Sequence, residues 1–379
     1  MTKLAIATPG IGVISETFIK RHINNLCLGE TCVIAETRKK PHCGQWETQN
    51  PSFIIDEQDF SKVTILDRVF SKLRRSFNLS DGSQKAKAIQ DFLIKQGVEV
   101  FMGEYLDFSL YYLPICKALG IRFFAHAHGY DVSSRLRDPN WRKRYLELNK
   151  ADGVITMSQY SKLMLEEIGI VCPIYVVPYG IIIEEFPVSN VLDSSVKFLA
   201  SGRLVSKKAP LVTLKAFNLA QKDFPDMTLT FIGSGSLEGE MKSYITQNKL
   251  ENKVKMLGAL PNEEVLKIMN QSDIYVQHSV VCPDTGDMEG LPVSILEAMA
   301  SGLPIVSTRH AGIPELVVEN ENGFLVEEFD AIGMAQKMLI MAQNKLLRIQ
   351  FAEVNKEKAK NQFHWEIEKS RLKEILSLI

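Results

Sequence analysis

The sequence predicts an α/β protein built from two Rossmann-like, doubly wound domains. Short β-rich runs alternate with helical patterns, which is typical of parallel sheets, and this alternation occurs twice along the chain. The 379 residues also exceed the ~250 to 300 at which a single hydrophobic core stops growing. We therefore expect two separate sheets.

The strands of each domain are expected at short apolar runs. The first set lies near residues 4–7, 32–35, 100–101, 123–125, 153–155 and 174–177, and the second near 197–200, 228–232, 254–257, 274–277, 304–307 and 323–326. A segment rich in turn and polar residues, 180–195, is expected to contain the linker. The first domain is thus expected over residues 1–185 and the second over 195–361.

Composition and charge argue against several classes of protein. The chain has 44 Lys and Arg against 45 Asp and Glu, so it lacks the strongly basic character expected of a nucleic-acid-binding protein. No stretch approaches the ~18 apolar residues of a membrane-spanning helix, and the first ten residues have no signal-peptide pattern. We expect a cytoplasmic enzyme that is neither secreted nor transmembrane.

The 6 cysteines are scattered without a CxxC pair, which predicts reduced thiols rather than disulfides. Cys32, His42 and Cys43 could instead suggest a metal. Structural zinc sites usually pair cysteines about two to four residues apart, and this spacing is absent, so reduced thiols are the favoured interpretation.

The segment EGLPVSILE, residues 289–297, carries the most information about function. Proline fits the first turn of a helix, so Pro292 is expected to open a helix that runs through Ala300. A helix N-terminus suits a phosphate oxygen, and Glu289 and Glu297 offer acceptors for hydroxyls on either side. Diphosphate flanked by hydroxyls describes a nucleotide sugar. The alternative is a capped core helix with two solvated acids.

Residues 286–318, GDMEGLPVSILEAMASGLPIVSTRHAGIPELVV, resemble the signature of the retaining GT-B glycosyltransferases of family 4 (glycosyl transferases group 1), with its Glu-x7-Glu element. Further matches precede it in the family's order: SETFI at 15–19, HAHGYD at 126–131, VPYG at 177–180, GRLVSKK at 202–208 and FIGSG at 231–235. The sequence is most similar in look to bacterial enzymes that build exopolysaccharides such as colanic acid. The resemblance implies two domains that face each other across a cleft, with a C-terminal helix, 362–379, that crosses back to the first domain.

The resemblance also implies an activity. The expected enzyme is a retaining, metal-independent transferase that moves a hexose-type sugar from a nucleoside diphosphate, of the UDP or GDP type, to a hydroxyl of a glycan or lipid-linked oligosaccharide. The leaving phosphate accepts the acceptor's proton on the same face, so no protein nucleophile and no cofactor are expected. Arg203 and Lys208 match the family's diphosphate-binding cations, which stabilise the negative charge that develops on the leaving group.

The site residues follow from the matched motifs. The expected catalytic residues are His128, Arg203, Lys208 and Glu289, and the expected donor-binding residues are Gly12, Gly233, Gly235, Gly290, Leu291, Pro292 and Glu297. His128 should lie close to the donor sugar, Glu289 should orient that sugar, and Glu297 should bind the ribose. His126 is the competing histidine and is more typical of a hydrogen-bonded scaffold. Asp131 is expected to fix the turn that follows it.

Two other functions are weighed against this one. Gly10 and Gly12 follow a strand and Glu36 ends the next, a near match to a dinucleotide fingerprint, so an NAD oxidoreductase is an alternative. Ser15 stands where the third glycine would be, and it is expected to cap a helix instead. A catalytically silent, nucleotide-sugar-binding partner subunit is the other alternative. The spacing of Asp284 and Asp287 is not that of a DxD metal element, so no metal is expected.

Two segments of the first domain suggest contact with a membrane surface. Apolar residues between 64 and 77 fall on one helical face beside three basic residues, and residues 135–145 mix basic and aromatic side chains. This pattern resembles a peripheral membrane helix. The alternative is an outer helix that packs its apolar stripe on the sheet.

Overall fold

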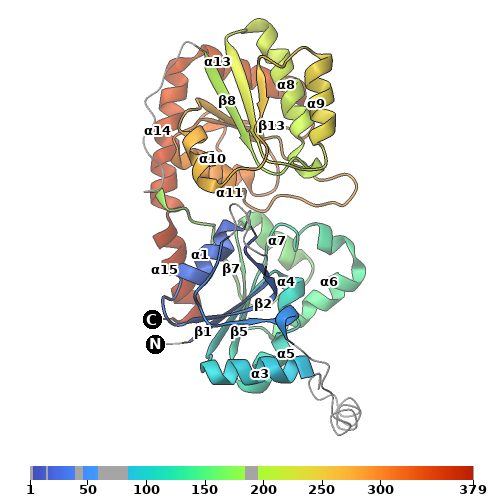
Figure 1. The fold of residues 1–379 in the computed structure, drawn as a ribbon, viewed down its shortest axis with the longest axis vertical. Helices are drawn as coiled ribbons and strands as arrows, with labels where there is room; N and C mark the ends of the chain where they lie inside the picture. The colour runs from blue at the N-terminus through green and yellow to red at the C-terminus, as the bar shows by residue number, and fades with distance from the viewer. Residues whose placement is uncertain (1–2, 14–15, 39–45, 59–83, 184–194, 379) are drawn as a thin grey trace. The chain divides into compact units, whose positions relative to one another are not determined.

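The computed structural model describes residues 3–13, 16–38, 46–58, 84–183 and 195–378. The chain divides into two compact units (Figure 1). The first unit contains Met1–Met157, Lys162–Val177 and Lys369–Ile379, and the second contains Ser158–Ser161 and Pro178–Glu368.

The first unit is built on a parallel sheet in the order β3-β2-β1-β4-β5-β6-β7. Its strands are β1 (Leu4–Ile11), β2 (Thr31–Arg38), β3 (Ser52–Ile54), β4 (Val100–Glu104), β5 (Arg122–His126), β6 (Gly153–Thr156) and β7 (Ile174–Val176). The order of the strands reverses between β1 and β4, and ligands of open α/β sheets bind at the carboxyl ends of the strands on either side of such a switch point. Glu104 ends β4 and His126 ends β5, in register with each other.

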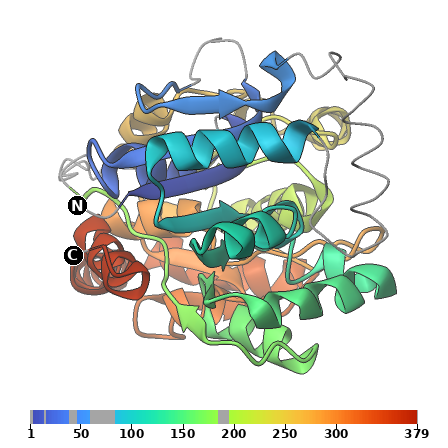
Figure 2. The same ribbon diagram turned by 90° about the horizontal axis from the view of Figure 1, so that it is seen from below.

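The helices of the first unit are α1 (Thr17–Asn25), α3 (Gln84–Gln96), α4 (Leu106–Ser109), α5 (Leu113–Leu119), α6 (Pro139–Tyr145) and α7 (Gln159–Glu167). Short 3-10 helices cover Ile55–Glu57, Ser134–Arg137 and Leu146–Lys150. Helices α3 and α5 pack together over one face of the sheet (Figure 2). Gly120 ends α5 in the left-handed conformation, which glycine adopts without steric penalty.

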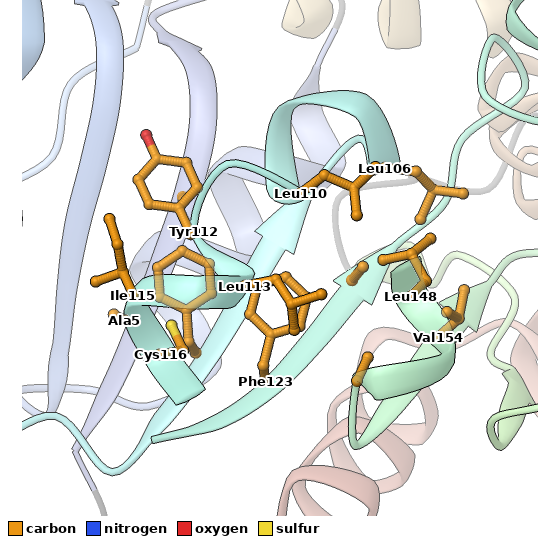
Figure 3. Close-up of a cluster of buried hydrophobic side chains, with 14 of the residues drawn as sticks. Ala5, Leu106, Leu110, Tyr112, Leu113, Ile115, Cys116, Phe123, Leu148 and Val154 are labelled. Atoms are coloured by element: carbon orange, nitrogen blue, oxygen red, sulfur yellow. The ribbon is translucent and has the colours of Figure 1, made fainter. Parts of the chain in front are cut away.

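Apolar residues from α5 and the neighbouring strands form the core of the first unit. Leu113 and Cys116 of α5 lie over Phe123 of β5, and Tyr112 lies beside them (Figure 3). These side chains are almost completely buried. Burial on both faces explains why the strands of a parallel sheet read as continuous apolar runs in the sequence.

The second unit has a parallel sheet in the order β10-β9-β8-β11-β12-β13. Its strands are β8 (Val196–Ser201), β9 (Met227–Ile232), β10 (Val254–Met256), β11 (Ile274–Val276), β12 (Ile305–Thr308) and β13 (Gly323–Val326). Its helices are α8 (Pro210–Asp223), α9 (Glu238–Gln247), α10 (Asn262–Met269), α11 (Val293–Ala300), α12 (Ile313–Leu316), α13 (Ala331–Gln343) and α14 (Lys345–Gln362), with a 3-10 helix over Ser206–Lys208. Helix α8 packs against α13, and α11 packs against α14.

The predicted fold class is confirmed: the structure contains two parallel α/β sheets, and each predicted strand is present. Strand β3 is an addition that the sequence analysis missed. Helix α15 (Trp365–Leu376) follows α14. Its residues from Lys369 onward belong to the first unit, whereas residues 362–368, also predicted to join the first domain, belong to the second. Within the described ranges, no helix has the length and apolarity needed to cross a membrane.

Several predicted features fall on residues outside the described ranges. They are the amphipathic segment 64–77, His42 and Cys43, Ser15, and most of the linker. At the start of α1, Glu16 occupies the N-cap position and makes no side-chain capping bond.

Candidate functional site

The second unit brings two residues of the predicted site into direct contact. Lys208 ends the 3-10 helix after β8, and Glu289 lies in the loop before α11. The Nζ atom of Lys208 lies 3.2 Å from Oε2 of Glu289, and the two side chains are only 16% and 10% exposed. Burial raises the pKa of Glu289, but the positive charges of Lys208 and Lys207 outweigh it, so the net pKa is lowered. Glu289 is therefore ionised, with Lys208 as its counter-ion.

The second oxygen of Glu289 has a different environment. Oε1 is buried and receives no hydrogen bond from any residue that the structure describes. Buried side-chain oxygens nearly always have a hydrogen-bond partner. An ionised carboxylate with one oxygen on a lysine and the other unpartnered is suited to accept a bond from a ligand hydroxyl.

The backbone of Glu289 is fixed by a histidine that the sequence analysis did not select. The Glu289 N–H donates to Nε2 of His310 at 3.1 Å, and Nδ1 of His310 lies 2.6 Å from Oε1 of Glu328. Since Nε2 accepts, Nδ1 must carry the proton and donate to Glu328. Glu328 also accepts from the backbone N–H of Val281. This chain of bonds fixes the position of Glu289.

Lys207 fixes the segment that precedes Glu289. Its Nζ atom lies 2.9 Å from Oδ2 of Asp287 and donates to the carbonyl of Met288 at 3.3 Å. The two adjacent lysines therefore have different partners: Lys207 binds the loop, and Lys208 binds the carboxylate of Glu289.

Helix α11 begins one residue later than predicted. Pro292 is its N-cap residue, and the helix runs through Ala300. Leu291 and Pro292 are buried, and their donor-binding role stays a prediction. The carbonyl of Gly290 accepts the N–H of Gly312 at 3.1 Å.

Glu297 lies one helical turn further along α11 and is half-buried. Its Oε1 accepts a hydrogen bond of 3.1 Å from the side-chain amide of Asn262, at the start of α10. Asn262 therefore orients the carboxylate that is predicted to bind ribose. The sequence analysis did not select Asn262 either.

The two glycines after β9 are required by the protein's own backbone. A Cβ atom at Gly233 would lie 1.9 Å from the carbonyl oxygen of Gly202, and one at Gly235 would lie 2.3 Å from that of Leu204. Gly233 also has a φ of 133°, which other residues rarely adopt. Close packing of the two loops explains both glycines without a ligand, and their donor-binding role stays a prediction.

A pocket of about 280 Å³, open to solvent, lies at the carboxyl end of β8. Arg203, Lys208, Ser201 and Gln277 are among its lining residues. Arg203 is exposed, and no ion pair joins it to another residue of the described ranges. The pocket thus combines an exposed guanidinium with a buried ammonium. Both groups are cationic donors for phosphate.

The remaining predicted site residues, Gly12 and His128, lie in the first unit. Gly12 follows β1 with a φ of 91°, a conformation that favours glycine. Nε2 of His128 lies 2.9 Å from Oε2 of Glu104, whose carboxylate is completely buried. Burial, with further repulsion from His126 and His22, lowers the pKa of His128 to about 4 against the raising effect of Glu104. His128 is neutral at physiological pH.

Asp131 has a different role from the one predicted. It was expected to fix the turn after it, but Oδ2 accepts the backbone N–H of His128 at 2.8 Å, and Oδ1 accepts that of Leu106 at 3.0 Å. The hydroxyl of Tyr145 also donates to Oδ1, at 3.1 Å. Asp131 therefore holds the turn that precedes it and the start of α4.

One group in the described part of the chain could offer three ligands to a metal ion. The ligand atoms of His22, Glu104 and His126 lie within 4.8 Å of one another, and all three residues are buried. Nδ1 of His22 and Nδ1 of His126 lie 2.7 and 3.0 Å from the oxygens of Glu104. Tetrahedral ligands about 2.0 Å from a zinc ion would stand about 3.3 Å apart. Hydrogen bonds from His22 and His128 account for both oxygens of Glu104 without a metal.

Comparison with known proteins supports the family resemblance of the second half of the chain. Residues 182–361 match the family described as Glycosyl transferases group 1. The chain is 33% identical over 255 residues to the amylovoran biosynthesis glycosyltransferase AmsK of Erwinia amylovora, covering 66% of this chain and 62% of AmsK. It is 33% identical over 222 residues to the putative colanic acid biosynthesis glycosyltransferase WcaL of Escherichia coli K12, covering 57% and 54%. The chain thus spans less than two thirds of the length of these relatives.

Solved structures support the fold. The chain superposes on Anabaena HepE, solved with UDP and glucose, with a TM-score of 0.79 and 17% identity, over 100% of both chains. It superposes on sucrose-phosphate synthase from Thermosynechococcus elongatus with a TM-score of 0.76 and 16% identity, over 100% of this chain and 99% of the other. At these identities, the similarity establishes the fold alone.

Proposed function

We propose that this protein, whose residues 182–361 match the glycosyl transferases group 1 family, is a retaining glycosyltransferase of exopolysaccharide synthesis. It moves a hexose-type sugar from a nucleoside diphosphate to a hydroxyl of a glycan or lipid-linked acceptor. Its relatives are named for amylovoran and colanic acid biosynthesis, which supports the polysaccharide role.

The observation that carries the proposal is the carboxylate of Glu289. One oxygen lies on Lys208 at 3.2 Å, and the other is buried without a hydrogen-bond partner among the described residues. A sugar bound through a diphosphate offers both complementary groups: phosphate oxygens for the lysine and hydroxyls for the carboxylate. The Glu289 backbone is fixed through His310, so this arrangement exists before any ligand binds.

The cations supply the catalytic effect. When the bond between the anomeric carbon and the phosphate oxygen breaks, negative charge grows on the leaving diphosphate. Arg203 and Lys208 line one pocket and stabilise that charge more in the transition state than in the ground state. The leaving phosphate takes the proton of the acceptor hydroxyl on the same face, which retains the anomeric configuration.

His128 acts on the donor sugar as a neutral residue. Because its pKa is about 4, its ring is not protonated at pH 7 and does not serve as a general acid. It hydrogen-bonds a sugar hydroxyl instead. Metal is not required in this scheme, because the two cations occupy the role that a divalent ion has in other transferases.

The donor is a UDP or GDP sugar. HepE was solved with UDP and glucose, and relatives include a UDP-Gal:alpha-D-GlcNAc-diphosphoundecaprenol alpha-1,3-galactosyltransferase of Escherichia coli and a GDP-mannose-dependent mannosyltransferase of Corynebacterium glutamicum. The undecaprenol carrier in the first of these names supports a lipid-linked acceptor. It also supports peripheral contact with the inner face of the membrane.

Thermal denaturation with a panel of UDP, GDP, ADP, their sugars and NADH tests the proposal. A ligand at about one hundred times its dissociation constant adds ~2.7 kcal/mol of stability, so the correct nucleotide should raise the melting temperature clearly. The matching sugar nucleotide is then incubated with a lipid-linked acceptor, and the anomeric configuration of the product is read by NMR. A shift with NADH alone contradicts the proposal. If the protein binds the nucleotide but neither transfers the sugar to any acceptor nor hydrolyses the donor, it is a silent partner subunit.

A further inference from the structure

Three histidines surround one carboxylate in the first unit. Glu104 Oε1 lies 2.7 Å from Nδ1 of His22, and Oε2 lies 3.0 Å from Nδ1 of His126 and 2.9 Å from Nε2 of His128. The side chain of Glu104 is 0% exposed, and the three imidazoles are 0%, 1% and 5% exposed. Burying a carboxylate costs free energy unless hydrogen bonds surround it, so the imidazoles around Glu104 stabilise it in its buried position.

A second carboxylate holds the backbone of His128. The backbone N–H of His128 donates to Asp131, which also accepts the N–H of Leu106, two residues after Glu104. The contacts therefore close a ring that runs from Glu104 through His128 and Asp131 to Leu106 and back along the chain. One carboxylate fixes the ring of His128, and another fixes its backbone.

The residue between Glu104 and Leu106 is strained. Tyr105 has a φ of 67° and a ψ of 127°, a positive-φ conformation that non-glycine residues rarely adopt. Its ring centroid lies 4.5 Å from that of His128, and its hydroxyl donates to Oε1 of Glu16 at 2.8 Å. Strained backbone persists where surrounding contacts hold it, and it is enriched at functional sites. Here the strain turns the chain so that Glu104 and Tyr105 both meet one imidazole.

We infer that Glu104 is a positioning residue that holds the His128 imidazole as the neutral tautomer with the proton on Nε2. An ionised carboxylate can only accept, so His128 must donate from Nε2, and its Nδ1 is then an acceptor. Burial raises the pKa of Glu104, but His126 and His22 lower it well below its ordinary value, which agrees with an ionised acceptor. The consequence for specificity is that the ring of His128 cannot donate a hydrogen bond to the donor sugar, because its one proton is held by Glu104. This step rests on the proposed function, whereas the tautomer itself does not.

NMR of protein labelled with ¹⁵N-histidine tests the tautomer directly, and the His128→Gln spectrum assigns the His128 signals. In the unsubstituted protein, we expect a protonated Nε2 and an unprotonated Nδ1 at neutral pH. A protonated Nδ1 with an unprotonated Nε2, or a doubly protonated ring, overturns the inference. This test needs no Glu104 variant and does not depend on whether the protein transfers sugar.

Two variants of Glu104 test the connection to turnover. Glu104→Leu removes every acceptor, and Glu104→Gln keeps one oxygen. In Glu104→Leu, the His128 signals should report a mixture of tautomers. The turnover number kcat should fall by about 10-fold to 100-fold, the scale seen when a partner that orients a metal-bound histidine is removed, while KM for the donor changes little. The kcat of Glu104→Gln should be intermediate between those of Glu104→Leu and the parent protein. The matched control is Glu368→Gln, because Glu368 is also a buried carboxylate and accepts the backbone N–H of Gly180 at 2.7 Å.

A double variant separates positioning from general structure. If Glu104 acts through His128, then adding Glu104→Leu to His128→Ala should cause no further loss of kcat. Equal losses of kcat with and without His128, or an unchanged His128 tautomer in Glu104→Leu, overturn the inference. If the parent protein transfers no sugar, the proposed function is contradicted. The NMR result still decides the tautomer.

Discussion

Lys208 and Glu289, both predicted to contact the donor, form an ion pair with each other at 3.2 Å within the second unit. Their contact means that an incoming diphosphate competes with Glu289 for the ammonium group. The pKa of Lys208 is lowered, chiefly by burial and against the raising effect of Glu289. The pair therefore links the stability of the second unit to the charges of its candidate site.

The first prediction concerns the two cations, which should differ when replaced. Arg203→Ala removes an exposed charge, so turnover should fall by about 10² to 10³, as for one lost charge-stabilising donor, with an unchanged melting temperature. Lys208→Ala should cause a similar loss of turnover, but it also leaves Glu289 buried without its counter-ion. The free energy of unfolding should then fall by about 3 to 5 kcal/mol. Urea denaturation and donor turnover measure the two effects.

Lys215→Ala provides the control, since Lys215 is an exposed residue of α8. Adding Glu289→Gln to Lys208→Ala should recover stability without recovering turnover, because the unpaired charge is removed. Near-normal turnover in Arg203→Ala and Lys208→Ala would refute their assignment to the diphosphate.

The second prediction separates the two glutamates. Glu297→Ala removes an acceptor for ribose hydroxyls, so affinity for the bare nucleoside diphosphate should fall by ~1.5 to 3 kcal/mol, the scale of a charged hydrogen bond. Glu289→Ala removes a contact to the reacting sugar, so kcat should fall. It also frees Lys208 for phosphate, so bare-nucleotide affinity should be unchanged or higher.

Calorimetric titration of both variants with the matching diphosphate measures these affinities. Asn262→Ala is a graded companion because Asn262 only orients Glu297, through a bond of 3.1 Å, and its effect should be smaller than that of Glu297→Ala. A loss of nucleotide affinity confined to Glu289→Ala would show that the two roles are reversed.

The sequence predicted the sheets well because central parallel strands, such as β1 and β11, are buried on both faces and read as apolar runs. Strand β3 (Ser52–Ile54) was missed because it begins with a polar serine and two of its three residues are only half-buried, so it does not read as a continuous apolar run. Such a strand has no periodicity of its own, and its pairing with β2 comes from tertiary structure.

The sequence marked candidate site residues but not the residues that hold them in place. The motif containing Glu289 marked the loop before α11, but nothing in the sequence linked Glu289 to His310, 21 residues away, or Glu104 to His22, 82 residues away. Those contacts depend on how loops meet at strand ends. Asp131 was misread for a related reason: a carboxylate in a turn can accept from either side, and the structure places its backbone donors upstream.

The third prediction is that chelation leaves transfer intact. Asp287, the nearer of the two loop aspartates to Glu289, has its Oδ2 atom 2.9 Å from Nζ of Lys207. A divalent ion there would have to displace an ammonium group. Activity in excess EDTA should therefore equal activity in added magnesium. Abolition by EDTA with recovery on adding magnesium or manganese would require Asp284 and Asp287 to be reassigned as ligands.

The fourth prediction concerns acid stability through His278, which is completely buried in the second unit. Its Nε2 accepts the backbone N–H of Phe329 at 2.8 Å, so protonation breaks that bond. Burial lowers the pKa of His278 from 6.5 to about 4, against the raising effect of Asp330 and Glu328. Between these values the unfolded chain binds a proton that the folded protein does not, so this contribution to stability is complete above pH 6.5 and is lost as the pH falls toward 4.

The loss through His278 should amount to about 2 to 3 kcal/mol by pH 4. Urea denaturation of the parent protein and of His278→Gln, which cannot be protonated, measures it. Because other groups also titrate in this range, the useful quantity is the difference between the two proteins in free energy of unfolding. That difference should be constant above pH 6.5 and should shift in favour of His278→Gln as the pH falls. A difference that stays constant down to pH 4 would show that His278 keeps an ordinary pKa in the folded protein.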